Sequence, residues 1–156
     1  MPGRLITNNV IVAYEALHSM HARKKGKTGS LALKLDVSKT YDRVEWLFLK
    51  GVMQKLGFPK KWIERVMTCV TTTSFSILLN GKPYGNVLPS RGIYQGDSLS
   101  PYLFLLCAEG FTSLLAKAEN DGKIYGASIC RGAPKVSNLL FVDDSLLFCR
   151  ATQNEV

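Results

Sequence analysis

Two adjacent carboxylates, Asp143 and Asp144, interrupt the otherwise almost wholly apolar decapeptide LLFVDDSLLF (residues 139–148). Two carboxylates about 4 Å apart repel each other by about 4 kcal/mol at an effective dielectric constant near 20, enough to raise one pKa by roughly three units. A divalent cation removes this repulsion. Mg²⁺ binds one or two carboxylates, keeps waters and takes its remaining oxygens from phosphates. The pair is therefore a candidate metal site.

A solvated surface turn is the alternative explanation for the aspartate pair, because Asp favours turns. If residues 138–142 and 145–149 are paired strands, Asp143 and Asp144 form the turn between them. Asn-Gly or Asp-Gly suits a tight hairpin turn better, since such turns need positive φ angles. From the spacing alone, the metal site and the solvated turn both stay open.

A third carboxylate, Asp36, lies near the end of the predicted strand LALKLDV (residues 31–37). Large apolar residues alternate along it with smaller or charged ones, as on a half-buried strand. The two faces carry Leu31, Leu33, Leu35 and Val37 on one side, and Ala32, Lys34 and Asp36 on the other. A strand beside the hairpin presents its carboxylate at the same sheet edge, which makes Asp36 the candidate third ligand.

Helices are predicted on either side of this strand. The first begins at Asn8 or Asn9 as the cap. Its apolar face carries Ile11, Tyr14, Leu17 and Met20 or His21. Asp42 and Glu45 resemble a capping box for a helix that ends at Leu56, with Gly57 in the C′ position.

The second half of the chain continues with a helix, a hairpin and another helix. Pro59 opens the first of these helices, and the hairpin SFSILLNGKPYG turns at Asn80-Gly81. Pro101 starts the next helix, whose apolar stripe ends at Ala118. Two strand-like runs follow, at residues 124–130 and 136–148.

Composition favours one ordinary domain with a nucleic-acid or other polyanionic partner. The chain has 156 residues, 46% of them apolar, enough for a real core. Twenty Lys and Arg residues against 12 acidic ones give a net charge of +8, which favours nucleic acid or an anionic membrane surface. No secretory signal or apolar run of about 20 residues occurs, so we expect an intracellular protein, nuclear or cytoplasmic, without membrane insertion.

The four cysteines lie far apart, each among apolar neighbours and without a CxxC pair. No His lies at metal-ligand spacing from them either, so the spacing does not predict a metal site. We interpret them as reduced core thiols: Cys69, Cys107, Cys130 and Cys149.

Three segments resemble, in order, the palm motifs of reverse transcriptases, in the form typical of non-LTR (LINE-type) retrotransposons of plants. They are KLDVSKTYDRVEW (34–46), PSRGIYQGDSLSPYLF (89–104) and LLFVDD (139–144). The intervening LGFPKKWIERVMTCV and SFSILLNG are also similar, so the resemblance covers nearly the whole chain. It implies an α+β fold of polymerase palm type: an antiparallel sheet containing the Asp36 strand and the aspartate hairpin, with helices packed on one face and the 101–118 helix central.

The resemblance further implies an RNA-directed DNA polymerase that works by two-metal nucleotidyl transfer. Asp36 and Asp143 would hold two Mg²⁺ ions about 4 Å apart, with Mn²⁺ as a substitute and Asp144 as the third acidic member. Tyr41 matches the aromatic steric gate that disfavours a 2′-hydroxyl. Its alternative role is ordinary packing before a helix.

A second segment would contact the incoming nucleotide and the template. Gln95 and Gly96 match the loop that cradles both, and the alternative is a helix-entry loop capped by Asp97 or Ser100. Arg91 meets a phosphate or forms a structural ion pair, and the sequence favours neither. The chain departs from the family pattern at Thr40, Tyr94, Ser98 and Val142.

The implied partners are an RNA template, a DNA primer and dNTPs. We expect residues 1–156 to be one partial reverse transcriptase domain, whose fingers start and thumb belong to a longer parent polypeptide. Loss of these parts should expose apolar surface and favour association. The alternative functions are a catalytically silent palm relic that binds nucleic acid nonspecifically and, more weakly, an unrelated phosphotransferase.

Overall fold

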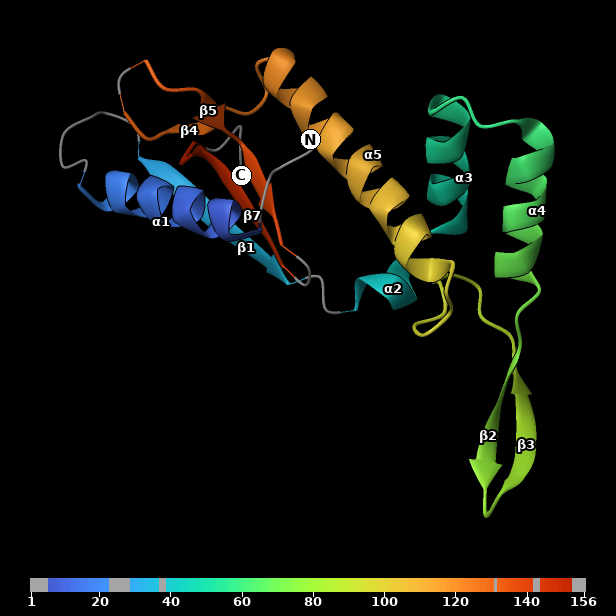
Figure 1. Cartoon of the computed structure of the whole chain (residues 1–156). Coiled ribbons are helices and arrows are strands. Elements are labelled where there is room, and N and C mark those ends of the chain that lie inside the picture. The colour runs from blue at the N-terminus through green and yellow to red at the C-terminus, as the bar shows by residue number, and fades with distance from the viewer. Residues whose placement is uncertain (1–5, 23–28, 37–38, 131, 142–143, 153–156) are drawn as a thin grey trace. The chain divides into compact units, whose positions relative to one another are not determined.

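The computed structural model describes residues 6–22, 29–36, 39–130, 132–141 and 144–152, and it divides into two compact units (Figure 1). Unit 1 takes the described residues of Met1–Ser38 and Thr112–Val156, and unit 2 is Lys39–Phe111. The helices are α1 (Ile6–Ala22), α2 (Thr40–Arg43), α3 (Trp46–Lys55), α4 (Lys60–Thr71) and α5 (Ser100–Asn120). The strands are β1 (Ser30–Asp36), β2 (Phe75–Leu79), β3 (Lys82–Val87), β4 (Ala127–Ser128), β5 (Lys135–Val136), β6 (Asn138–Leu140) and β7 (Asp144–Arg150). The expectation of one partial domain over residues 1–156 stays a prediction.

Unit 1 is built on a three-stranded antiparallel sheet in the order β1-β7-β6. β1 pairs with β7 along its whole length, from Ser30 opposite Arg150 to Asp36 opposite Asp144. β6 pairs with the other edge of β7, with Leu139 opposite Leu146. The predicted placement of the Asp36 strand beside the C-terminal hairpin is therefore confirmed.

Helix α1 covers one face of this sheet, as the predicted α+β palm-type fold requires. Ala13 and Ala16 lie buried against Leu139 and Phe148 in the core of unit 1. Two side chains of α1 also bond backbone carbonyls of unit 1: Asn9 Nδ2 donates to Leu140 O at 3.0 Å, and Ser19 Oγ donates to Ile129 O at 2.8 Å. The fold class predicted from the sequence is confirmed.

The buried face of α1 is not the one that the sequence predicted. Ile11 and Tyr14 are 56% and 71% exposed, and Leu17 is also exposed, while Ala13 and Ala16 are buried. Small side chains allow the helix backbone to approach the sheet closely, and larger ones at those positions would hold it away. Asn9 is likewise not a cap, because α1 begins at Ile6.

The faces of β1 are also reversed relative to the simplest interpretation of its pattern. Ala32 packs into the core of unit 1, whereas Leu33 is 46% exposed. Directly opposed residues of an antiparallel pair share a face, so Ala32 lies on the same side as its partner Phe148. Because side chains alternate between the two faces of a strand, Lys34 and Asp36 lie on the same face as Ala32, the face that α1 covers.

Unit 2 has its core between α3, α4 and the first part of α5. Leu49 and Met53 are fully buried there, packed with the buried residues Val44, Ile63, Val66, Val70, Ile93, Leu103 and Cys107. Gly57 follows α3 with a φ angle of +80°, and Pro59 precedes α4 as its cap residue, as predicted. The predicted capping box is wrong, because Asp42 lies within α2 and Glu45 is the N-cap of α3 without a side-chain cap bond.

The β2–β3 hairpin turns at Asn80 and Gly81, whose φ angles of +49° and +77° fit a type I′ turn and confirm the prediction. Large apolar side chains of this hairpin are exposed: Ile77, Leu78, Leu79, Tyr84 and Val87. The expected exposed apolar surface is thus present among the described residues. Association through it stays a prediction.

The cysteines are all free, but they are not all core residues. Cys107 is buried and Cys149 is partly buried, whereas Cys69 and Cys130 are exposed. Cys69 lies on the solvent side of α4, and Cys130 follows the two-residue strand β4 rather than a long buried one. Among the helices in the described part of the chain, none is both long and apolar enough to cross a membrane.

Candidate active site

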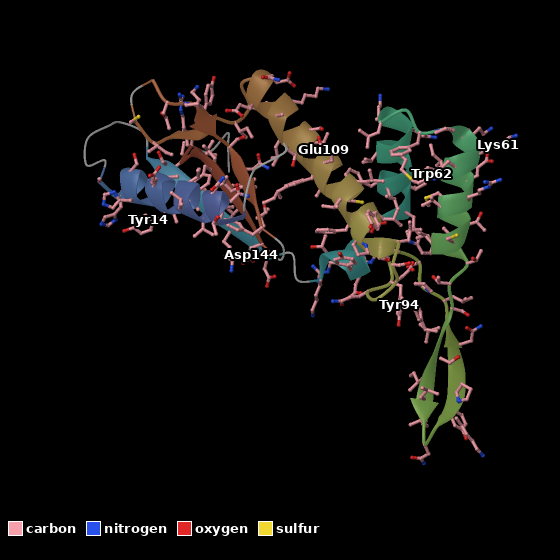
Figure 2. The ribbon with its side chains drawn as sticks, in the orientation of Figure 1. Tyr14, Lys61, Trp62, Tyr94, Glu109 and Asp144 are labelled. Atoms are coloured by element: carbon pink, nitrogen blue, oxygen red, sulfur yellow. The ribbon has the colours of Figure 1, made fainter. Side chains whose placement is uncertain are left out.

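The acidic edge of unit 1 lies where β1 ends and β7 begins, and Figure 2 labels Asp144 there. We use this name for Asp36 and Asp144, which are directly opposed in the β1–β7 ladder. Directly opposed residues have Cβ atoms about 4.5–5.5 Å apart and share one face of the sheet, and two like charges in that position destabilise the pairing. A cation beside this pair offsets that repulsion.

Lys34 supplies that cation in the structure. It precedes Asp36 by two residues on the same strand face, and its Nζ lies 2.8 Å from Oδ2 of Asp144. The pKa of the Lys34 ammonium is raised above its ordinary value, first by the hydrogen bond to Asp144 and then by the attraction of the Asp144 charge. Desolvation lowers it by less, and the attraction of Asp36 is the smallest contribution. Sequence analysis missed this pairing, although the spacing of two between Lys34 and Asp36 signalled a shared face.

Asp144 is the first residue of β7 and not a central turn residue, which corrects the prediction that both aspartates form the turn. The Phe141 N–H donates to the Asp144 carbonyl at 2.7 Å, so Asp144 belongs to the ladder that the two strands form. Its carboxylate is consequently held by sheet geometry rather than by a loop. Asp143 lies outside the described residues.

The donor chemistry of the acidic edge fits a hard divalent cation. Two carboxylates from neighbouring strands converge on one face, and a positively charged group already bonds one of them. Mg²⁺ selects carboxylate, water and phosphate oxygens, so this donor set suits it. Within the described ranges, which do not include Asp143, no group of three or more His, Cys, Asp or Glu side chains comes together.

The loop that begins at Arg91 is fixed in unit 2 by main-chain bonds to the segment around α2. The N–H of Gly92 donates to Val44 O at 2.8 Å, and the N–H of Ile93 donates to Tyr41 O at 2.8 Å. The Trp46 indole Nε1–H donates to Gly92 O at 2.7 Å. The first and second palm-like segments are thereby joined, residue to residue, within one compact unit.

Any side chain in place of Gly92 would clash with the backbone of Asp42, a constraint that sequence analysis missed. Its φ angle is +91°, and a Cβ on it would lie 2.9 Å from the Asp42 carbonyl oxygen and 3.1 Å from two further Asp42 backbone atoms. Such a contact forces backbone movement. The only sequence signal was a glycine four residues before Gly96.

Tyr41 is half-buried and stacked on Phe104, with ring centroids 4.9 Å apart and planes at 15°. This stacking is the packing that the sequence offered as the alternative to a steric gate. The stack does not decide between the two roles, because a steric gate also needs a ring that is held rigidly. The steric-gate role of Tyr41 therefore stays a prediction.

Arg91 forms an ion pair with Glu45 at 3.5 Å, with both side chains more than half exposed. The structural pairing that the sequence left open is therefore present, although an exposed pair of this kind contributes little to stability. Asp97 Oδ1 accepts from the Leu99 N–H at 3.3 Å, so the helix-entry role of this loop is present as well. Gly96 has a φ angle of +108° just before it.

A hollow of about 340 Å³ opens beside this loop and is confined to unit 2. It is lined by Asp42, Thr73, Phe75, Pro89 and residues 91–95, so it includes Arg91 and Gln95. Tyr94, labelled in Figure 2, packs its ring 5.3 Å from that of Phe75. Of the predicted site residues, Asp36 and Asp144 come together in unit 1, while Tyr41, Arg91, Gln95 and Gly96 belong to unit 2.

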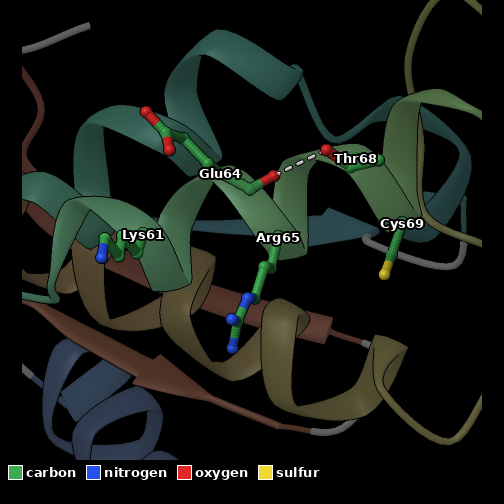
Figure 3. Close-up of a pocket in the computed structure, with 5 residues that line it drawn as sticks. All are labelled: Lys61, Glu64, Arg65, Thr68 and Cys69. Atoms are coloured by element: carbon green, nitrogen blue, oxygen red, sulfur yellow. Dashed lines mark hydrogen bonds between the residues drawn. The ribbon is translucent and has the colours of Figure 1, made fainter.

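A second hollow, of about 530 Å³, lies on the solvent side of α4 and is lined by Lys61, Glu64, Arg65, Thr68 and Cys69 (Figure 3). Thr68 Oγ1 donates to the Glu64 carbonyl at 2.8 Å, and Lys60 pairs with Glu64 at 3.9 Å. These are the ordinary contacts of the polar face of an amphipathic helix. The hollow holds none of the predicted site residues.

Comparison with known proteins agrees with this geometry. A family model described as reverse transcriptase (RNA-dependent DNA polymerase) matches residues 4–155. The chain is 46% identical over 68 residues to an uncharacterised mitochondrial protein of Arabidopsis thaliana, covering 44% of this chain and 56% of that protein. It is 34% identical over 118 residues to an uncharacterised 149 kDa protein of transposon TX1 from Xenopus laevis, covering 75% of this chain and 9% of that protein.

A Pol polyprotein from the type-1 retrotransposable element R2 of Popillia japonica is 31% identical over 125 residues, covering 80% of this chain and 20% of the polyprotein. The chain thus spans between 9% and 56% of the length of these three relatives. The retrotransposon type inferred from the three palm-like segments agrees with the names of the transposon relatives. Because the family model matches nearly its whole length, the chain belongs to the reverse transcriptase (RNA-dependent DNA polymerase) family.

Proposed function

We propose that this chain is the palm part of an RNA-directed DNA polymerase of a non-LTR retrotransposon. The observation that carries the proposal is the direct opposition of Asp36 and Asp144 on one face of the β1–β7 ladder, in a chain of the reverse transcriptase family. Carboxylates fixed by a ladder are preorganised, so no reorganisation is needed when charge develops during the reaction.

Asp36 and Asp143 would hold two Mg²⁺ ions, or Mn²⁺ in their place, with Asp144 as the third acidic group. Bound there, the ions would supply activation of the primer 3′-hydroxyl and neutralisation of the triphosphate and the leaving pyrophosphate. The protein itself provides no nucleophile. Its part is to fix the carboxylates, align the substrates and exclude the wrong sugar.

The residues of unit 2 would align and select the nucleotide. Tyr41, stiffened by its stack on Phe104, is suited to disfavour a 2′-hydroxyl at the sugar. Gln95 and Gly96 would contact the nucleotide and the template, since the Gln95 amide both donates and accepts hydrogen bonds. We assign Arg91 mainly to the structure of the loop, because its guanidinium already pairs with Glu45.

The proposed partners are an RNA template, a DNA primer and dNTPs, for which the net charge of +8 is favourable. A longer parent polypeptide would supply the rest of the fingers and the thumb. Such substrates place the activity inside the cell, in the nucleus or the cytoplasm.

Primer extension on an RNA template with dNTPs, in Mg²⁺ and then Mn²⁺, tests the proposal. Circular dichroism first establishes that the chain and its variants are folded. We expect Asp36→Asn and Asp143→Asn to lower incorporation by at least about 100-fold, since a metal ligand contributes several kcal/mol to the transition state. Asp121→Asn is the matched control, because Asp121 pairs with Lys123 at 3.7 Å on the surface of the same unit.

Incorporation that both active-site variants abolish and the control retains would support the polymerase. A folded chain that binds template and primer but incorporates no nucleotides, both alone and after the fingers and thumb are restored, would overturn it in favour of the silent palm relic. Phosphoryl transfer to an acceptor other than a primer, dependent on the same carboxylates, would point to the phosphotransferase.

A further inference from the structure

Lys34 and the acidic edge form one charge cluster on the sheet. Two carboxylates, Asp36 and Asp144, face each other directly, and the ammonium of Lys34 bonds the second of them at 2.8 Å. Lys34 reaches Asp144 diagonally, from the ladder position next to Asp36 on the same face. Diagonal neighbours in an antiparallel pair are within reach of a long side chain.

The contact is open to solvent on the lysine side. The Lys34 side chain is 64% exposed, while that of Asp144 is 33% exposed. An exposed lysine carries its charge on a flexible four-carbon stem, so the ammonium can leave the carboxylate for water at small cost. The carboxylate, fixed at the start of β7, cannot leave in the same way.

We propose that Lys34 is the built-in counter-ion of the acidic edge, and that a divalent cation displaces its ammonium from Asp144 when it binds there. The inference rests on the metal site of the proposed function, and it states that the Lys34 ammonium competes with the metal for the Asp144 carboxylate. In the metal-free chain, Lys34 offsets one of the two negative charges of the opposed carboxylates and so weakens their repulsion at this end of the β1–β7 ladder. When a divalent cation binds, its two positive charges offset both carboxylates.

The competition follows from charge and from space. The ammonium already bonds Oδ2 of Asp144, so a metal ligated by that oxygen replaces one cation by another. A single and a double positive charge about 5 Å apart in water repel enough to weaken metal binding about tenfold at moderate salt. Removal of the lysine charge should therefore tighten metal binding by about that factor.

The test measures Mn²⁺ alone, without nucleotide or template, by isothermal titration and by the loss of the free-ion electron paramagnetic resonance signal. The full chain and five variants are compared, the fifth being Asp36→Asn. Lys34→Met and Lys34→Gln remove the charge, and Lys34→Arg keeps it. Lys123→Met is the matched control, because it removes an ion-paired lysine elsewhere in unit 1.

We expect Lys34→Met and Lys34→Gln to bind Mn²⁺ about tenfold more tightly than the wild-type chain, and Lys34→Arg and Lys123→Met to stay within about twofold of it. Asp36→Asn identifies the site, because binding at the acidic edge must weaken in that variant. Thermal unfolding gives a second readout: Mn²⁺ should raise the Tm of Lys34→Met by more than it raises that of Lys123→Met.

The two failures are distinguishable. If Asp36→Asn weakens Mn²⁺ binding but Lys34→Met binds no better than Lys123→Met, the counter-ion inference is wrong and the metal site stands. If neither the wild-type chain nor Lys34→Met shows Mn²⁺ binding that depends on Asp36, both the inference and the proposed metal site are wrong.

Discussion

Replacement of Gly92 by alanine should destabilise unit 2 more than the same change at Gly57 or Gly51. Two separate costs act at this position. An alanine with a left-handed φ angle, here +91°, costs roughly 1–2 kcal/mol. The added Cβ would also lie 2.9 Å from the Asp42 carbonyl oxygen, so the backbone must shift, at a cost typical of overpacking of roughly 1–3 kcal/mol. We expect Gly92→Ala to lower the free energy of unfolding by about 2–5 kcal/mol.

Two other glycines of unit 2 separate these costs. Gly57 has a φ angle of +80° and open space where a Cβ would stand, so Gly57→Ala should cost only the backbone term, about 1–2 kcal/mol. Gly51 lies within α3, also with open space, so Gly51→Ala should stabilise by roughly 0.5–1 kcal/mol. The predicted order of stability is therefore Gly51→Ala, wild type, Gly57→Ala, Gly92→Ala.

Urea unfolding followed by tryptophan fluorescence measures this series. The chain has two tryptophans, Trp46 and Trp62, and both lie in unit 2. Trp46 also donates to the Gly92 carbonyl, so its emission should change in folded Gly92→Ala as the loop moves. If Gly92→Ala unfolds at the same urea concentration as Gly57→Ala and keeps the wild-type emission, the packing of Gly92 against Asp42 is not as described.

Two further predictions concern the core of unit 2. Leu49→Ala should lower the free energy of unfolding by about 2–5 kcal/mol, because the Leu49 side chain is fully buried. Leu47 is 84% exposed, so Leu47→Ala should change that free energy by less than about 0.5 kcal/mol. Equal losses for the two variants in urea unfolding would contradict this packing. Burial raises the pKa of Cys107 to about 11 from 9.0, so the unfolded thiol ionises at lower pH than the folded one. Stability should then fall as pH rises from 9 to 11, by at most about 1.4 kcal/mol per pH unit, and Cys107→Ala should lack this component of the slope.

Short-range patterns carried most of the fold that could be predicted. The turn at Asn80-Gly81, Gly57 after α3 and Pro59 before α4 depend on the conformational limits of single residues, which any context respects. The strand ending at Asp36 follows from its alternation of two. These signals do not depend on which distant residues the segment packs against.

Choices that depend on distant partners were not predictable in the same way. The face of α1 that packs was set by how closely Ala13 and Ala16 approach Leu139 and Phe148, which hydrophobicity alone misjudged. Gly92 is bonded to Val44, 48 positions away in the chain, and the sequence contains no sign of that contact.

In the candidate site, too, the arrangement of the strands was predictable, whereas the contact that depends on their exact register was not. The opposition of Asp36 and Asp144 was expected in outline, because a strand beside a hairpin places both at one sheet edge. The lysine that bonds Asp144 was not, since an ion pair between residues 34 and 144 depends on the register between two strands distant in sequence. The roles of Asp143, Tyr41, Gln95 and Gly96 in catalysis stay predictions.

Because β1 and β7 pair residue by residue, the opposition of Asp36 and Asp144 depends on the number of residues in β1 more than on which apolar residues they are. Exchange of one apolar side chain for another within β1 leaves Asp36 opposite Asp144. Deletion of a single residue between Ala32 and Asp36 moves the carboxylate to the other face, because side chains alternate strictly along a strand. A copy of this sequence that had lost only the Leu33 codon would therefore keep every aspartate and all three palm-like segments, yet Asp36 and Asp144 would no longer meet.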